Sequence, residues 1–245
     1  TASIVFGGST PSVTANTEFY NGTNWTEVNN LNTARTNLGS GGTYPSALAF
    51  GGYSTTNLTV TETWNGTNWA EVNDMNTARN ALAGAGSSST NALGFGGVEP
   101  TVSNKTETWN GTNWTEVNNL NTARRSMGSA GASNTSALAF GGNAPPGLNL
   151  KNETEQWNGT NWTEVNNLNT ARRGLGGTGD KLSAIAFGGY TTTNVANTES
   201  WNGTSWTEVN DLSTARNAMG QAGSSVSGIS MGGSTGPDAV TEEFT

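Results

Sequence analysis

The stretch WNGTNWAEVNDMNTAR at residues 64–79 decides the fold of this chain, because it occurs five times with few changes. The other copies occupy residues 20–35, 109–124, 157–172 and 201–216. The arginines that end the five copies stand 44, 45, 48 and 44 residues apart. A period of about 40–50 residues indicates stacked supersecondary units, so residues 1–245 are predicted to form a single repeat domain.

The first strand predicted in each unit has large and small side chains in alternation. In residues 46–52 (SALAFGG), Leu48 and Phe50 are expected to face one neighbour, while Ala47 and Ala49 face the other. Such a strand is predicted to be buried on both sides. A loop separates it from the next predicted strand, residues 61–64.

The rest of the unit predicts a hairpin, a crossover and an inner strand. Asn65-Gly66 is a strong hairpin signal, which we interpret as a turn with positive φ at both positions, and the returning strand is residues 69–72. A polar crossover then leads into a Gly- and Ala-rich segment, residues 81–86, which suits strands crowded around an axis. Four short strands per unit and no helical pattern predict an all-β fold, a β-propeller of four-stranded antiparallel blades.

The number of predicted strands bears on how the ring closes. Six strands end in Gly-Gly and six contain the repeated Glu, but only five outer Trp strands and five inner strands can be found, which gives 22. Six blades, with the first and the last incomplete, use every strand. Five blades would leave two strands over, and exposed spare strands promote aggregation, so six blades are favoured over five.

Composition excludes several classes of function. The net charge is −8 with only ten Lys and Arg, which argues against a nucleic-acid partner, and no apolar run is long enough for membrane insertion. The chain has no His and no Cys, so neither a catalytic triad nor a thiolate metal site is expected, and no cofactor is implied. The glutamates recur at fixed strand positions, which indicates a structural role. We therefore expect no catalytic residues, no metal site and no enzyme activity.

The order of these residues resembles the kelch repeat. A Gly-Gly doublet closes one strand, Glu-x-aromatic stands in the next, a Trp follows, then an apolar residue six positions later and Arg four positions after that. One instance comprises Gly51, Gly52, Glu62, Trp64, Trp69, Met75 and Arg79. The chain holds about five and a half such repeats. The kelch-like propellers of copper oxidases need His and Cys ligands, which this chain lacks, so the resemblance does not imply a copper oxidase.

The near-identical Asn- and Thr-rich copies also resemble kelch-like repeats in virion proteins of tailed bacteriophages, especially tail-associated ones. This resemblance implies a viral protein located in a virion, such as a phage tail, or in the extracellular space. Its implied partners are a cell-surface glycan or receptor, or other virion proteins, and a homo-oligomer is compatible with it.

Binding residues are expected where the copies differ, because variable loops on a rigid scaffold are where binding evolves. The loop after each Gly-Gly changes in every copy, the last one spanning residues 234–240. The residue after each repeated Arg also varies, being Thr, Asn or Arg. Both should lie on one face of the propeller. The expected binding residues are Tyr53, Val98, Asn143 and Tyr190 on the loops, and Arg125 and Arg173 nearer the axis.

Three functional classes remain at this stage. The first is a non-catalytic binding module that recognises a receptor or carbohydrate. The second is a structural or decoration module of a virion or tail assembly without a ligand. A propeller hydrolase ranks last.

Overall fold

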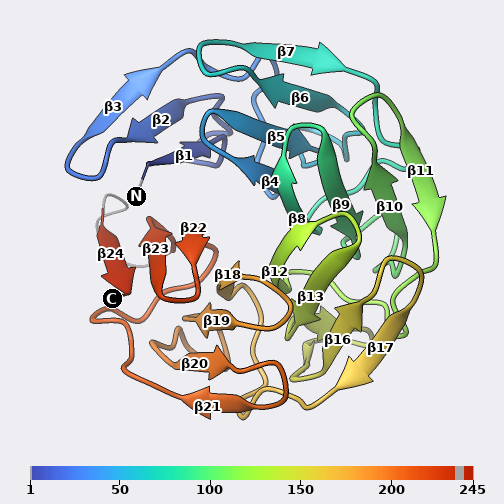
Figure 1. Cartoon of the computed structure of the whole chain (residues 1–245), viewed down its shortest axis with the longest axis vertical. Helices are drawn as coiled ribbons and strands as arrows, with labels where there is room; N and C mark the ends of the chain where they lie inside the picture. The colour runs from blue at the N-terminus through green and yellow to red at the C-terminus, as the bar shows by residue number, and fades with distance from the viewer. Residues whose placement is uncertain (1, 235–239, 245) are drawn as a thin grey trace.

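The innermost strands are built from small residues because they stand close to one another. A Cβ atom added at Gly84 would lie only 2.2 Å from the carbonyl oxygen of Ser40, on the inner strand of the neighbouring blade. In the computed structural model, which describes residues 2–234 and 240–244, these strands surround the centre of a ring (Figure 1). The inner strands are β4 (Gly39–Thr43), β8 (Ala83–Ser88), β12 (Gly128–Ser133), β18 (Gly176–Gly179) and β22 (Gly220–Ser224).

The remaining blade strands follow outward from the centre, each antiparallel to its neighbour. The second strands are β1 (Ser3–Phe6), β5 (Ser46–Phe50), β9 (Asn91–Phe95), β13 (Ser136–Phe140), β19 (Ala184–Phe187) and β23 (Ser227–Met231). The third strands are β2 (Thr17–Tyr20), β6 (Thr61–Trp64), β10 (Thr106–Trp109), β16 (Thr154–Trp157), β20 (Thr198–Trp201) and β24 (Thr241–Phe244). The outer strands are β3 (Trp25–Val28), β7 (Trp69–Val72), β11 (Trp114–Val117), β17 (Trp162–Val165) and β21 (Trp206–Glu208).

The structure confirms the all-β fold with six blades. Blades 2 to 5 have four strands each, whereas blade 1 (β1-β2-β3) and blade 6 (β22-β23-β24) have three. Blade 1 has no inner strand and blade 6 has no outer strand among the described residues. We call the junction of these two blades, on the left of the ring in Figure 1, the seam. The described residues form no α-helix, and so none that could span a membrane.

The hydrophobic core lies between the blades. As expected, Leu48 and Phe50 of β5 pack toward blade 3, against Trp109 and Trp114. Ala49 of the same strand packs on the opposite side, toward Leu31 at the end of blade 1. The large and small faces of each second strand therefore fit the aromatic residues of one neighbouring blade and the apolar residues of the other.

The hairpin between the third and outer strands differs from its expected geometry. Trp64 pairs with Trp69, so the loop has four residues, 65–68. Only Gly66 has a positive φ, and the expectation that both Asn and Gly need one is wrong. The side chain of Asn65 closes the loop instead, because its Oδ1 accepts hydrogen bonds from the backbone N–H groups of Thr67 and Asn68, both at 2.9 Å.

Candidate ligand-binding site

The variable loops lie on one face because they all join second strands to third strands. In blades 2 to 5, one more pair of residues at the start of the loop extends the ladder between the inner and second strands. Two of these bridges join residues expected to bind a ligand, Arg125 with Asn143 and Arg173 with Tyr190. Tyr53 and Val98 make the same bridge with Thr36 and Asn80. The four expected loop residues thus occupy equivalent positions at the start, or root, of their loops. Arg125 and Arg173 are the bridge partners of two of them.

Backbone hydrogen bonds between successive blades hold these roots in position. The N–H of Ala81 donates to the carbonyl of Asn37, Ser126 donates to Ala81, and the series continues through Gly174 to Ala218, at 2.8–2.9 Å. All five residues have φ between 51° and 61°, and each precedes an inner strand by two positions. These bonds form an arc that links blades 2 to 6 on the variable-loop face.

The loops of blades 3 and 4 form a cleft of about 480 Å³ on this face. Three of the expected binding residues line it, namely Val98, Arg125 and Asn143. The other residues that line it are Pro100, Thr101, Val102, Pro145, Gly147 and Leu148. The last of these lie on or beside a small hairpin, β14 (Asn143–Ala144) with β15 (Asn149–Leu150), within the longest variable loop. The cleft thus has apolar walls with a small number of polar groups.

Two polar residues of the cleft, Asn143 and Arg125, could take part in binding a ligand. Asn143 is 1% exposed, and its Oδ1 is buried with no hydrogen-bond partner in the structure. A buried acceptor without a partner costs free energy, and a donor brought by a ligand would satisfy it. The side chain of Arg125 is half-buried and lines the same cleft. An acceptor and a cationic donor therefore lie between apolar loop residues.

The carboxylate nearest to the cleft in sequence has other partners. Glu99 lies 3.1 Å from the ammonium of Lys105 and accepts a hydrogen bond from Ser103. Burial raises the pKa of the Glu99 carboxyl, but these hydrogen bonds and the Lys105 charge outweigh burial, so the pKa lies below its usual value. Glu99 is therefore an ionised group of the loop itself, and it does not line the cleft.

Tyr53 and the pair Arg173–Tyr190 lie outside this cleft. The Arg173 guanidinium stands over the Tyr190 ring at 4.8 Å, a cation–π contact within blade 5. Tyr53 is exposed on the loop of blade 2. The sixth variable loop is described only at Ser234 and Val240, because residues 235–239 lie outside the described residues. The role of all six residues in binding stays a prediction.

Sequence reasoning missed the side chains that join neighbouring variable loops. Asn57 donates from Nδ2 to the carbonyl of Val98 in the next blade at 3.0 Å, and it bonds Asn80 through Oδ1. Asn194 and Asn217 repeat the second contact in blades 5 and 6. The recurrence of Tyr and Asn four residues apart at 53/57 and 190/194 was the available signal. Pro100, Pro145 and Leu148 of the cleft carried no comparable motif.

The functional-site geometry cannot be transferred from a relative. A scan against models of protein families finds no match, and a search of curated proteins finds no similar sequence. Within the described residues, no group of three or more acidic side chains is arranged so that it could hold a metal ion.

Proposed function

We propose that this chain is a non-catalytic binding module that recognises a carbohydrate on a cell surface or receptor, as a kelch-type component of a phage-like virion. The β-propeller fold commonly serves as a binding module, and the pattern of Gly-Gly, Glu, Trp and Arg is compatible with a kelch repeat. The repeated Asn- and Thr-rich texture supports the virion origin. A virion or extracellular location follows from the same reasoning.

The observation that carries the proposal is the unpartnered Oδ1 of Asn143 beside Arg125 in the cleft of blades 3 and 4. The guanidinium can donate to a hydroxyl or to a carboxylate of a sugar, and a sugar hydroxyl can donate to the Asn143 oxygen if the side chain turns toward the cleft. Leu148 and Val102 offer apolar surface to the C–H face of a pyranose ring. Ligand sites are commonly apolar clefts with a few convergent polar groups, and this cleft has that composition.

Binding to a glycan array, followed by titration of the best glycan, tests the proposal. Arg125→Ala and the double change Val102→Ser/Leu148→Ser should each weaken binding by about tenfold or more, equivalent to about 1.4 kcal/mol. Arg173→Ala is the matched control, because Arg173 occupies the same position in the next blade but does not line the cleft. Its affinity should stay near that of the wild type.

A different result would move or remove the site. If Arg173→Ala and Tyr190→Ala abolished binding while Arg125→Ala did not, the ligand would lie on blade 5. If changes in the uniform Asn-Gly hairpins on the opposite face abolished binding, the variable-loop face would be the wrong one. Hydrolysis of a glycan that binds would overturn the non-catalytic part of the proposal.

The alternative is a structural or decoration module of a virion or tail assembly. The observation in its favour is the pair of incomplete blades at the seam, where sheet edges are open to another chain. Imaging of an assembled particle with and without the chain separates this function from ligand binding.

A further inference from the structure

The seam is closed by the same kind of contact that joins the other blades. Trp25 of β3 donates from Nε1 to the hydroxyl of Thr241 on β24 at 3.2 Å. Between other blades the outer-strand Trp makes the equivalent bond, as from Trp69 to Thr17 at 3.1 Å and from Trp114 to Thr61 at 2.9 Å. A hydrogen bond from Tyr20 to Glu243 at 3.2 Å adds a second bridge. The ring is therefore held together although both of its end blades are incomplete.

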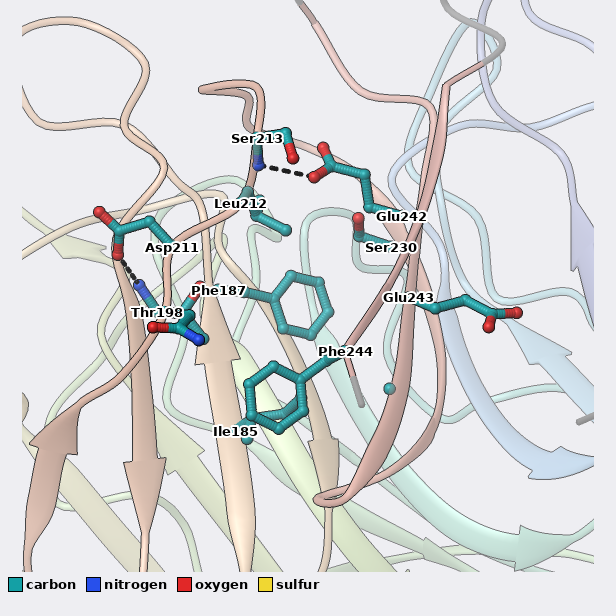
Figure 2. A pocket seen from close by; sticks show the side chains of 12 residues that line it. Ile185, Phe187, Thr198, Asp211, Leu212, Ser213, Ser230, Glu242, Glu243 and Phe244 are labelled. Atoms are coloured by element: carbon teal, nitrogen blue, oxygen red, sulfur yellow. Dashed lines mark hydrogen bonds between the residues drawn. The ribbon is translucent and has the colours of Figure 1, made fainter.

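A cavity of about 120 Å³ lies between blades 5 and 6. It lies at the place that an outer-strand Trp fills at other blade junctions. At four other blade junctions an outer-strand Trp packs on the second-strand Phe of the preceding blade, with ring centroids 4.7–4.9 Å apart. The cavity is lined by Phe187 and Thr198, the residues that would contact such a Trp. Figure 2 shows Phe244 of β24 beside Ile185 and Phe187, with Glu243 pointing away from them.

The outer edge of β24 borders this cavity and is open. Third strands of the other blades pair on both sides, for example β10 with β9 and with β11. The described residues give β24 one strand partner, β23. An open sheet edge beside a pocket for an alternate side chain is the arrangement by which proteins bind an added strand.

On the other side of the seam, Glu18 of β2 is exposed. In every other blade the glutamate at this position pairs with the arginine that ends the preceding crossover, as Glu107 with Arg79 at 2.8 Å and Glu155 with Arg124 at 2.7 Å. Among the described residues the structure records no ion pair for Glu18. The carbonyls that Arg79 also bonds, those of Gly96 and Lys105, have their equivalents at Gly7 and Asn16.

A single type of segment carries groups that fit both sides of the seam. In each copy the outer-strand Trp and the crossover Arg are ten positions apart, and the chain then enters the inner strand of the next blade. The Trp belongs to one blade and the Arg to the following one. The arc of backbone hydrogen bonds ends at Asn37 before blade 2 and at Ala218 before β22 of blade 6, so it is interrupted where blade 1 has no inner strand.

We propose that the seam binds one extended segment of the repeat's own chemistry, Trp-Thr-Glu-Val followed ten residues after the Trp by Arg, supplied by a partner polypeptide. The Trp enters the cavity against Phe187 and donates to Thr198, while the strand pairs with the open edge of β24. The Arg binds Glu18 and the carbonyls beside it, and the following residues pair with β1. Blades 6 and 1 then gain their fourth strands.

The bound segment is not one of the five copies in residues 1–245, because each of these is already used within its own ring. All five copies hold a crossover arginine that is nearly or fully buried and paired with a glutamate. One difference weakens the fit at the seam. Asn76 and its equivalents donate to the backbone carbonyl of the outer-strand Trp, as Asn76 does to Trp114 at 3.1 Å, but Ser213 stands at this position before blade 6. The bound strand therefore lacks this one hydrogen bond.

A synthetic peptide with the sequence of residues 110–133 tests the proposal on the whole chain. It contains an outer strand, its crossover with Arg124, and an inner strand. We expect saturable 1:1 binding by fluorescence anisotropy of a labelled peptide, a higher melting temperature, and slower amide hydrogen exchange in β24 and β1. Peptides with Trp114→Ala or Arg124→Ala should each bind at least about fivefold more weakly.

A double-mutant cycle shows whether Arg and Glu meet at the seam. Glu18→Gln on the exposed surface should weaken the wild-type peptide by about fivefold but leave the Arg124→Ala peptide unaffected, since the charged pair is then already lost. Glu27→Gln, on exposed β3, is the matched control and should change nothing. Thr198→Val removes the hydroxyl at the cavity end and leaves Glu18 unchanged at the Arg end, so its effect on peptide affinity tests the two ends separately.

Three outcomes would overturn the proposal. These are no saturable binding, binding that is insensitive to both the Trp and the Arg of the peptide, and protection from exchange that falls outside β24 and β1. A dimer of the free chain that the peptide dissociates would show that a second copy is the occupant. None of these results depends on whether the cleft of blades 3 and 4 binds a glycan.

Discussion

The arginine that ends each crossover bonds several groups of the following blade. Arg79 donates to the carbonyls of Gly96 and Lys105 at 2.9 and 2.8 Å and to Glu107 at 2.8 Å. Glu107 in turn accepts from the backbone and side chain of Asn76 at 2.7 and 2.9 Å. Burial lowers the pKa of Arg79, and the Glu107 charge opposes that shift. The pair is buried but well hydrogen-bonded, which is the condition under which a buried ion pair is tolerated.

Removing one member of such a pair should be costly. We expect Arg124→Met to lower the free energy of unfolding by about 3–5 kcal/mol, because it leaves the Glu155 carboxylate buried without its counter-ion. Lys151→Met is the matched control, since the Lys151–Glu153 pair is partly exposed and should contribute below about 1 kcal/mol. Urea denaturation measures both. Similar losses for the two variants would mean that the buried pair is not essential to the blade.

The aromatic residues, like the ion pairs, include buried members in the core and exposed members on the surface. Trp114 is 5% exposed and packs on Phe50 of the preceding blade at 4.9 Å between ring centroids, whereas Tyr53 is 39% exposed. Trp114→Ala should therefore cost about 3–5 kcal/mol of stability. Tyr53→Ala should cost within about 0.5 kcal/mol. Denaturant melts that gave the reverse order would contradict the assignment of Tyr53 to a binding surface and Trp114 to the scaffold.

At the scale of the element, backbone proximity limits the inner strands to small residues. Gly84→Ala should destabilise the fold by about 1–3 kcal/mol, because its Cβ would lie 2.2 Å from the backbone oxygen of Ser40. Gly41→Ala on the adjacent inner strand is the control, since its nearest neighbour would be the Ala92 Cβ at 3.1 Å. Thermal melts should show the larger loss for Gly84→Ala. Equal effects would indicate that the inner strands can separate to relieve the overlap.

The strands could be predicted from the sequence because their signals are local and repeated. The alternation of large and small residues in 46–50 specified two buried faces, and Gly-rich composition specified the inner strands. The arc of residues with positive φ could not be predicted, since Asn37, Ala81 and Ser126 are not glycine and are held by the next blade. The Asn-Gly loop was misjudged because the side chain of Asn65 closes it in place of a second positive φ.

The sequence allowed prediction of the face that carries the candidate site, but not of the cleft within that face. The order of the strands places all variable loops together, so the residues at the loop roots could be named from the sequence. Which loops meet in a cleft depends on their own conformations, and Val98, Arg125 and Asn143 meet in the cleft of blades 3 and 4. The small hairpin β14–β15, which brings Leu148 to the cleft, has no sequence signal of its own.

At the scale of the whole molecule, the ring is a series of blades that each contact two neighbours, and the two blades at the seam are incomplete. Stability in repeat architectures is approximately a sum of terms for the units and their interfaces, so the incomplete blades should open first. Blades 1 and 6 each have three strands, and blade 6 has an open edge at β24. Blade 4 lies between two complete blades, and β13 is almost entirely buried.

We therefore expect native-state hydrogen exchange to begin at the seam. Amides of β24, β22 and β1 that are hydrogen-bonded should exchange at low free energies of opening, while those of β13 and β16 should approach the free energy of global unfolding. Trp25→Phe should widen the difference, because it removes the bond to Thr241 that joins blades 1 and 6 but leaves blade 4 unchanged. Mass spectrometry of peptic fragments resolves these strands. Exchange that was uniform around the ring would show that the blades unfold as one cooperative unit and that the open edges of the seam have no influence on where opening starts.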